Sequence, residues 1–439
     1  MADTIYALSS GRPPAGIAVI RISGSRSLEI NSLFVSNSQK LRPRTAHMRS
    51  LRDPVTGDAL DQALMLTFLA PATVTGEDMV EWHCHGGQAV VRAVLAALAR
   101  AGEARPDLAL RQAESGEFTR RAFENGRIDL NEAEGLADLL SAETESQRRA
   151  ALLMAEGHFS RRLDAWRLEL LRLSALAESL LDFSDEDDVA GDDAMHELRR
   201  GLEALGRDMA RQLAAPRAER LRDGVRLVLA GPPNSGKSTL LNALVGHEAA
   251  IVSDIAGTTR DRIEVPVDMG GIAFVLTDTA GLAVQTEDAI ERIGIDRARQ
   301  AMDTCDILLW LGDAQDCPQC DASVIRIAAQ MDRSAWGMPD GADIAISALK
   351  GSNMESLVAL ILSHAQSLLP VEGQVALHQR QRTGVADMYD AVNAALCEGD
   401  LLIIAEHLRT ARLAMDRLVG SSGIEDMLGA LFGRFCIGK

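Results

Sequence analysis

Residues 227–238 read LVLAGPPNSGKS and decide how the middle of this 439-residue chain folds. The apolar start of the stretch predicts a buried strand, and the sequence TLLNALVG that follows it predicts a helix. A glycine-rich loop between a strand and a helix turns backbone N–H groups toward phosphate oxygens. Lys237 adds a positive charge, and Ser238 adds a hydroxyl for Mg²⁺. The stretch therefore predicts a phosphate-binding loop, and the residues expected to contact nucleotide are Asn234, Ser235, Gly236, Lys237, Ser238 and Thr239.

Two further motifs follow in the order that a GTP hydrolase requires. The sequence GTTRD at 257–261 lies in a loop without clear apolar period, where a threonine can complete the Mg²⁺ shell while γ-phosphate is present. The run 272–276 predicts a buried strand that leads into DTAG at 278–281. Asp278 can hold Mg²⁺ through water, and Gly281 can bring its N–H to the γ-phosphate. Together the three motifs predict a Ras-like α/β GTPase domain, with further nucleotide contacts from Gly257, Thr258, Thr259, Asp278, Thr279, Ala280 and Gly281.

The motifs expected beside the nucleotide base are less regular. Ser347 and Ala348 resemble the loop that packs over a guanine, and Asp332 can accept hydrogen bonds from the guanine N1 and N2 groups. The Asn and Lys that usually precede such an Asp are replaced by Ala329 and Gln330. The sequence therefore predicts weaker nucleotide binding than a complete motif would give, and it leaves guanine selectivity open.

Leu282 follows the DTAG motif, at the position where many small GTPases carry a glutamine that orients the attacking water. A leucine side chain cannot form that hydrogen bond. The water must therefore be oriented by another residue, and Glu287, Asp288 and Glu291 are the nearby carboxylates.

The composition predicts a soluble globular protein, not a disordered one. Apolar residues make up 47% of the chain and charged residues 25%. No apolar run reaches membrane-spanning length, and no signal-peptide pattern opens the chain. Six scattered cysteines are too few for a disulfide framework, so a cytoplasmic location without membrane attachment is expected. A net charge of −18 argues against a surface that is basic throughout and leaves a local basic face open.

Four segments are expected from the change of pattern along the chain. Residues 1–118 mix predicted strands with an amphipathic helix that Gly102 is expected to end, as in an α+β domain. Residues 119–215 and 373–439 carry apolar residues at helical spacing. Because amphipathic helices need a partner face, these two segments are expected to form one discontinuous helical domain. The GTPase domain, 216–372, would be an insertion in it.

Two groups of histidine and cysteine residues raise the question of a metal or redox site. His83, Cys84 and His85 lie on an expected strand, where only the two histidines share a face. A strand that runs into a Gly-Gly turn is therefore favoured over a metal site. Cys317 and Cys320 form a single CxxC pair without a second pair, which makes zinc binding or redox use the lesser alternative.

The chain as a whole resembles the bacterial and mitochondrial tRNA modification GTPases called MnmE or TrmE. The resemblance rests on motifs that occur in the order of that family from one end of the chain to the other. They are Asp3–Ile5, Arg21–Gly24, Thr75–Asp78, His85–Gly87, Gly116–Thr119, Arg121–Phe123, Leu130–Glu134, Asp182–Phe183, Asp254–Asp261, Glu291–Gly294 and Cys436–Lys439.

The resemblance implies a homodimer joined through the N-terminal domain, which binds 5-formyl- or 5,10-methylene-tetrahydrofolate as a one-carbon donor. It implies a heterotetramer with a flavoprotein partner, MnmG (GidA). The complex would add a carboxymethylaminomethyl or aminomethyl group at C5 of the wobble uridine of certain tRNAs. The folate contacts implied by motif match are Arg21, Glu81, Arg121 and Lys439, of which the arginines suit the carboxylates of folate. Cys436 is either a reactive or an inert thiol.

In that family a K⁺ ion takes the place of an arginine finger, where the GTPase domains of a dimer meet. The resemblance implies Ser238 and Thr259 as Mg²⁺ ligands and Glu291 as the residue that orients water. Asp254 and Ala256 would be additional nucleotide contacts. The K⁺ ligands implied by the match are Asn234, Ser253, the Ile255 carbonyl and Thr258.

Two other functions stay open. A GTPase switch in ribosome assembly would fit the nucleotide motifs without any folate chemistry, and an ATPase would fit the irregular base-side motif. The N-terminal folate motifs and the C-terminal CIGK favour the tRNA-modifying enzyme over the first. The GTTRD and SALK sequences favour it over the second. Which tRNAs are modified, and whether glycine or ammonium supplies the nitrogen, is not encoded in recognisable motifs.

Overall fold

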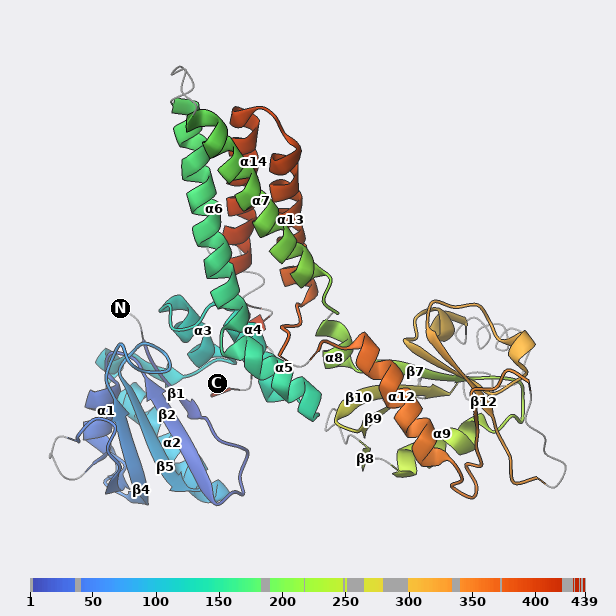
Figure 1. The fold of residues 1–439 in the computed structure, drawn as a ribbon. Coiled ribbons are helices and arrows are strands. Elements are labelled where there is room, and N and C mark those ends of the chain that lie inside the picture. The colour runs from blue at the N-terminus through green and yellow to red at the C-terminus, as the bar shows by residue number, and fades with distance from the viewer. Residues whose placement is uncertain are drawn as a thin grey trace, which may run out of the picture. The chain divides into compact units, whose positions relative to one another are not determined.

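Figure 1 shows the structure, which is a computed structural model of the chain. The residues it describes are 3–35, 41–182, 190–216, 218–247, 249–250, 264–278, 299–333, 340–371, 373–420, 429, 431–433, 435 and 437–438. They divide into two compact units, one made of Met1–Ala137 with Val419–Lys439 and the other of Asp138–Leu418. These units do not coincide with the four expected segments, whose boundaries stay a prediction. Within the described ranges, no helix combines the length and apolar character needed to cross a membrane.

The first unit is built on a six-stranded sheet with the order β3-β4-β5-β2-β1-β6. Neighbouring strands are antiparallel except for β1 and β6, which are parallel. The strands are β1 (Thr4–Leu8), β2 (Ile17–Ser23), β3 (His47–Arg52), β4 (Ala59–Phe68), β5 (Met79–His85) and β6 (Leu110–Gln112). The helices are α1 (Ser27–Phe34), α2 (Gln88–Ala104), α3 (Glu117–Glu124) and α4 (Leu130–Ser141), which begins in this unit.

The core of the first unit lies between one face of this sheet and helices α1 and α2. Trp82 of β5 is fully buried there, packs against Phe34 with ring centroids 5.1 Å apart, and donates its indole N–H to Asn31 Oδ1 at 2.8 Å. Its neighbours along the strand, Glu81 and His83, are only partly buried because successive strand residues point to opposite faces. The polar residues of β5 therefore lie on the other face of the sheet.

Gly102 does not end its helix, contrary to the expectation from sequence. Helix α2 continues to Ala104. Pro106, two residues later, begins a short 3₁₀ turn. A Cβ atom on Gly102 would lie 2.7 Å from the carbonyl oxygen of Leu110. The glycine therefore allows close contact between the helix and the segment that forms β6, and proline ends the helix instead.

The end of the chain belongs to the first unit. Phe432 and Phe435 form an apolar cluster with Ala133 of α4. Closer to the C-terminus, the Ser9 hydroxyl donates to the carbonyl oxygen of Gly438 at 2.7 Å. The C-terminal segment is thus held against the loop that follows β1.

The second unit contains a seven-stranded sheet with the order β13-β12-β11-β7-β10-β9-β8. The first five strands in this order are parallel, and the hairpin of β9 and β10 and the edge strand β8 are antiparallel. The strands are β7 (Val225–Ala230), β8 (Ala249–Ala250), β9 (Glu264–Met269), β10 (Ile272–Asp278), β11 (Ile307–Trp310), β12 (Ser323–Ala328) and β13 (Ile344–Ala345). The helices beside them are α8 (Ala218–Asp223), α9 (Lys237–His247) and α12 (Met354–Leu368).

Strand β7 is central in this sheet, which explains the apolar run from Leu227 to Ala230 that makes up most of it. Leu227 and Leu229 pack in one core cluster with residues of α9 and α12, and Val228 and Ala230 pack in a second cluster. A parallel strand that is covered on both faces has no polar side.

Four helices of the second unit form a bundle (Figure 1). They are α6 (His158–Asp182), α7 (Ala190–Leu213), α13 (Gln379–Cys397) and α14 (Leu401–Val419). Helix α5 (Glu145–Ala155) lies outside this bundle and contacts α6, α8 and β10. Helix α7 packs against both α6 and α13. Arg380 of α13 donates to the carbonyl oxygen of Leu418 in α14 at 3.0 Å. Helices from before and after the α/β sheet thus pack together, as expected from their apolar periodicity.

Candidate functional site

The phosphate-binding loop connects β7 directly to α9. Gly231 has a φ of +149°, and a Cβ atom there would lie 2.6 Å from the carbonyl oxygen of Leu311, so glycine is required. Lys237 is buried, and its ammonium donates to the carbonyl oxygens of Gly231 at 2.9 Å and Pro232 at 2.8 Å. Burial lowers the pKa of Lys237, and the carboxylate of Asp278 opposes that shift. The lysine charge is therefore held across the loop in which phosphate is expected.

Ser238 and Asp278 meet beside this lysine. The Ser238 hydroxyl donates to Asp278 Oδ2 at 2.6 Å, and Asp278 is buried. The contact forms because β10 runs parallel to β7 with Asp278 opposite Leu229, one residue before the end of β7. A hydroxyl and a carboxylate at one point are the hard oxygen ligands that Mg²⁺ prefers. The two residues assigned to Mg²⁺ from separate motifs are thus in contact.

The base-side residues lie after β12 and β13 of the same sheet. The Ser347 hydroxyl donates to Asp332 Oδ1 at 2.7 Å and accepts the backbone N–H of Lys350 at 3.2 Å. The hydrogen bond from Ser347 is the main cause that lowers the pKa of Asp332. Asp332 is therefore held ionised, with a fixed orientation, next to the loop that contains Ala348.

Gln330 contacts the phosphate-binding loop, which the sequence did not reveal. Its side-chain N–H donates to the carbonyl oxygen of Asn234 at 3.2 Å. Both residues have a φ of +63°, which is the left-handed conformation. This conformation directs the Gln330 side chain and the Asn234 carbonyl differently from the way a helix or strand would. The residue that replaces the usual lysine thus connects the base-side segment to the phosphate side.

Several expected nucleotide and metal residues lie outside the described residues. These nucleotide and metal residues are Ser253, Asp254, Ile255, Ala256, Gly257, Thr258, Thr259, Thr279, Ala280, Gly281 and Glu291. Leu282, Cys436 and Lys439 also lie outside the described residues.

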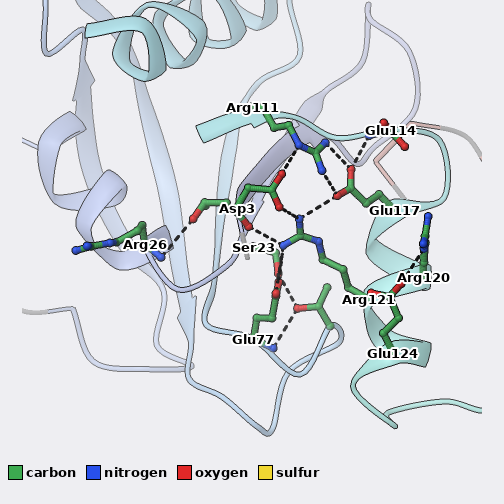
Figure 2. Close-up of polar contacts among 12 residues, drawn as sticks. Asp3, Ser23, Arg26, Glu77, Arg111, Glu114, Glu117, Arg120, Arg121 and Glu124 are labelled. Atoms are coloured by element: carbon green, nitrogen blue, oxygen red, sulfur yellow. Dashed lines mark hydrogen bonds and ion pairs between the residues drawn. The ribbon is translucent and has the colours of Figure 1, made fainter. Parts of the chain in front are cut away.

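The first unit contains a buried cluster of charged residues around Arg121 (Figure 2). Arg121 of α3 is 7% exposed. Its Nη1 donates to the Asp3 carbonyl at 2.8 Å and to both carboxylate oxygens of Glu77 at 3.2 Å. Its Nη2 donates to Asp3 Oδ1 at 2.8 Å and to Glu117 Oε1 at 2.9 Å. One arginine therefore joins the N-terminal segment, the loop before β5 and helix α3.

Arg111 completes this cluster. It donates to both carboxylate oxygens of Glu117, at 2.9 and 2.6 Å, and pairs with Asp3. Burial raises the pKa of Glu117, but the hydrogen bonds from Arg111, the Glu114 N–H and Arg121 outweigh burial, so the net shift is downward. Glu77, Glu117 and Asp3 occur in three of the family motifs, yet nothing in their spacing predicted that all three bind one arginine.

Arg21 and Glu81 form a second, more exposed pair on the face of the sheet opposite to α1 and α2. They stand opposite each other on β2 and β5, and Arg21 Nε and Nη2 donate to Glu81 Oε1 at 3.0 and 2.9 Å. The Arg21 guanidinium lies 5.6 Å from the centre of the Phe118 ring. His83 Nε2 lies 3.4 Å from the other Glu81 oxygen. The structure therefore brings two of the residues assigned to folate into contact.

His85 does not converge with His83, since its Nδ1 pairs with Asp61 at 2.7 Å. Burial raises the pKa of Cys84 to about 12, which keeps this thiol protonated at neutral pH. Over the described part of the chain, no group of three or more His, Cys, Asp or Glu side chains is placed to hold a metal ion.

Comparison with known proteins identifies the family. A model described as "GTP-binding protein TrmE N-terminus" matches residues 4–127, and a model described as "MnmE helical domain" matches residues 130–436. A protein of Rhizorhabdus wittichii named "tRNA modification GTPase MnmE" is 55% identical over 439 residues, covering 100% of this chain and 97% of its own. Proteins of the same name from Zymomonas mobilis and Novosphingobium aromaticivorans are each 49% identical, with coverage of 99% and 100% of this chain and 100% of theirs.

Among solved structures, the G domain of the T. maritima FeoB iron transporter is 23% identical and covers 32% of this chain and 99% of its own, with a TM-score of 0.22. Because this TM-score is low, no conclusion about the chain is drawn from the similarity. The family matches and the observed α+β, helical and α/β P-loop parts confirm the expected fold class. The chain therefore belongs to the MnmE (TrmE) family of tRNA modification GTPases, and its activity is GTP hydrolysis in tRNA modification.

Proposed function

We propose that this chain couples K⁺-dependent GTP hydrolysis to the addition of a carboxymethylaminomethyl or aminomethyl group at C5 of the wobble uridine of certain tRNAs. It would do so as a homodimer, in a heterotetramer with a flavoprotein of the MnmG (GidA) type, and with a one-carbon tetrahydrofolate. The observation that carries the proposal is the convergence of Lys237, Ser238 and Asp278 at the end of β7 and β10.

Membership of the family implies that the chain binds GTP and Mg²⁺. The proposed site for both is the end of β7 and β10. The Ser238 hydroxyl and, beyond the described residues, Thr259 would hold Mg²⁺, with Asp278 acting through water. Lys237 would leave its two carbonyl partners for phosphate oxygens, which are stronger acceptors for an ammonium. Asp332, oriented by Ser347, would accept the guanine N–H groups. The remaining GTP contacts proposed are those named from the sequence between Asn234 and Ala348.

The K⁺ site is proposed at Asn234, together with Ser253, the Ile255 carbonyl and Thr258. Asn234 is exposed, and its left-handed backbone, braced by Gln330, gives its side chain a defined direction beside the loop. A bound K⁺ would supply positive charge where negative charge develops on the phosphates. Glu291 is proposed to orient the attacking water.

Folate is proposed to bind in the first unit at Arg21 and Glu81, and Lys439, which lies outside the described residues, is proposed as a further contact. The side chains of this pair are 20% and 14% exposed, so both remain within reach of a ligand. The Glu81 carboxylate suits the amino edge of a pterin, and Arg21 suits a folate carboxylate. For Arg121 we propose a different role from the direct folate contact implied by the sequence, because its two terminal nitrogens already donate to Asp3, Glu77 and Glu117. We assign it the positioning of this region rather than direct contact.

The test is steady-state hydrolysis of GTP by the full chain in K⁺ and in Na⁺, with ATP as the control nucleotide. We expect fast turnover only with GTP and K⁺. Asn234→Ala should abolish the stimulation by K⁺, whereas Asn242→Ala, an exposed change on α9, should leave it intact. Equal rates in K⁺ and Na⁺ for the unaltered chain would refute the K⁺ site.

Folate binding needs a separate measurement, because a ribosome-assembly GTPase would pass the first test. Calorimetric titration of the full chain with 5-formyl-tetrahydrofolate should show binding that Arg21→Ala removes. Arg26→Ala is a matched control, since the Arg26 side chain forms an exposed ion pair with Glu29. No heat of binding, with GTP hydrolysis intact, would favour the assembly factor.

A further inference from the structure

The turn between β9 and β10 lies at the opposite end of the hairpin from the nucleotide site. Gly270 and Gly271 form it with φ values of +57° and +79°, the backbone that a two-residue turn between twisted strands requires. At its other end β10 carries Asp278, which accepts the Ser238 hydroxyl. The distance along the strand is about 20 Å at the usual rise per residue. Because β10 is paired with β7 on one side and β9 on the other, the turn and Asp278 belong to one stiff ladder.

This turn is held by the first turn of helix α5. The backbone N–H of Ser146 donates to the carbonyl oxygen of Gly271 at 3.1 Å. N–H groups in the first turn of a helix have no partner within the helix and lie at the positive end of its dipole, so a carbonyl is a favourable partner there. A Cβ atom added to Gly271 would lie 3.6 Å from the Glu145 Cβ, so even the smallest side chain at this position would contact α5.

A capping box fixes the same end of α5 and adds a second link. Gln147 Oε1 accepts the Thr144 N–H at 2.9 Å, and the Thr144 hydroxyl accepts the Gln147 N–H at 3.4 Å. The Gln147 side-chain N–H donates to the carbonyl oxygen of Arg222 at 3.1 Å. Arg222 lies in α8, directly before β7. The start of α5 is therefore bonded to the segments that lead into β7 and β10. Strand β10 carries Asp278, and β7 leads through the phosphate-binding loop to Lys237 and Ser238 at the start of α9.

The other end of α5 contacts the helical bundle. Met154, near the end of α5, is 3% exposed, and the side-chain N–H of the fully buried Gln381 of α13 approaches its sulfur at 3.9 Å. Helix α6 begins only three residues after α5 ends. A shift of α5 therefore cannot occur without a change in its packing against α13, because close-packed interiors transmit displacement.

We propose that the contact of Ser146 and Gln147 with Gly271 and Arg222 transmits the state of the nucleotide site to the helical bundle. The inference rests on the proposed assignment of Ser238 and Asp278 to bound Mg²⁺ and nucleotide. Mg²⁺ bound to the Ser238 oxygen, and a metal-bound water that donates to Asp278, would add new contacts to both side chains and so shift the end of β10. The stiff hairpin carries the change to its turn, and the turn carries it to α5. By reciprocity, weakening the α5 contact must change the relative affinity for nucleotide states by the same factor.

The first experiment is hydrogen–deuterium exchange on the full chain without nucleotide, with GDP and Mg²⁺, and with a non-hydrolysable GTP analogue and Mg²⁺. We expect the exchange rates of α5 amides, and of α13 amides around Gln381, to differ by about fivefold between nucleotide states, as for the gain or loss of one hydrogen bond. Ser146→Pro removes the donor N–H at a position in the first helical turn, where proline is best tolerated. It should abolish this difference. Ser146→Ala keeps the N–H and should preserve it.

A second variant keeps the test decisive if Ser146→Pro does not fold. Gln147→Glu retains the acceptor of the capping box, adds a charge that a helix N-terminus favours, and removes the N–H that reaches Arg222. It should stabilise α5 yet reduce the nucleotide-dependent difference.

The outcomes separate this inference from the proposed function. Calorimetry measures whether the GTP analogue binds. If it binds and the exchange of α5 is the same in all nucleotide states, or if the difference survives in both Ser146→Pro and Gln147→Glu, the inference is overturned and the nucleotide site stands. If the analogue does not bind, the proposed site fails and the inference falls with it.

Discussion

Replacing Arg121 tests whether the buried charge cluster holds the first unit together. Arg121 is 7% exposed. Arg121→Met keeps much of the aliphatic volume of the side chain and removes the guanidinium, which donates to oxygens of Asp3, Glu77 and Glu117. The three carboxylates would then lie near one another with one arginine fewer. The hydrogen bond from Arg121 to the Asp3 carbonyl would also be lost.

The expected loss of stability is about 3 kcal/mol. Removing one partner of a buried charge pair costs about 3–5 kcal/mol, because the other charge is left uncompensated. The lower end applies here for two reasons. Glu117 keeps its pair with Arg111 at 2.6 Å, and the Asp3 side chain is 36% exposed, so water can replace part of what it loses. Most of the cost therefore falls on Glu77, whose side chain is 17% exposed.

A urea titration of the full chain, read by hydrogen exchange of peptides from β1 and α3, reports the stability of this unit separately from the rest. Arg120→Met is the matched control. Arg120 is the adjacent residue, and it forms a surface ion pair with Glu124, in which the two side chains are 53% and 51% exposed. Its replacement should cost at most about 0.5 kcal/mol. If the two variants lose the same stability, the cluster does not stabilise this unit and the argument from burial is wrong.

Three further predictions concern charge and the nucleotide site. Burial raises the pKa values of Asp3 and Glu117, but hydrogen bonds and charge from their arginine partners outweigh it and lower both, so their stabilisation is complete above their ordinary pKa values. This stabilisation is lost as pH falls through the lowered pKa values. The melting temperature, measured from pH 7 downward, should therefore fall, and the fall should be smaller in Glu117→Gln. Ser238→Ala should weaken Mg²⁺-dependent GTP binding at least about tenfold by titration calorimetry, with little change in the melting temperature without nucleotide. Gln330→Ala removes the bond to the Asn234 carbonyl and should weaken GDP binding about fivefold in fluorescent-nucleotide competition; unchanged affinity would show that this bond is dispensable.

The sequence by itself determined the nucleotide-binding part of this protein. A strand, a glycine-rich loop and a helix follow one another within residues 225–247, and their geometry depends on backbone conformations that neighbouring residues specify. The contact of Ser238 with Asp278 was also foreseeable, because residues at the ends of adjacent parallel strands meet at one edge of a sheet. The helical segments and their mutual packing followed from apolar periodicity in the same way.

Only the tertiary structure decided which distant residues meet. Arg121 and Asp3 are 118 positions apart, and nothing local to either shows that they pair. Gly102 reads as a helix end, but close approach of Leu110 overrides that signal. Gln330 reads as a lost lysine, yet its left-handed backbone brings its side chain to Asn234. Periodicity and turn preference act over a few residues, whereas these contacts depend on how whole strands and helices pack, and packing energies are shared among many residues distant in sequence.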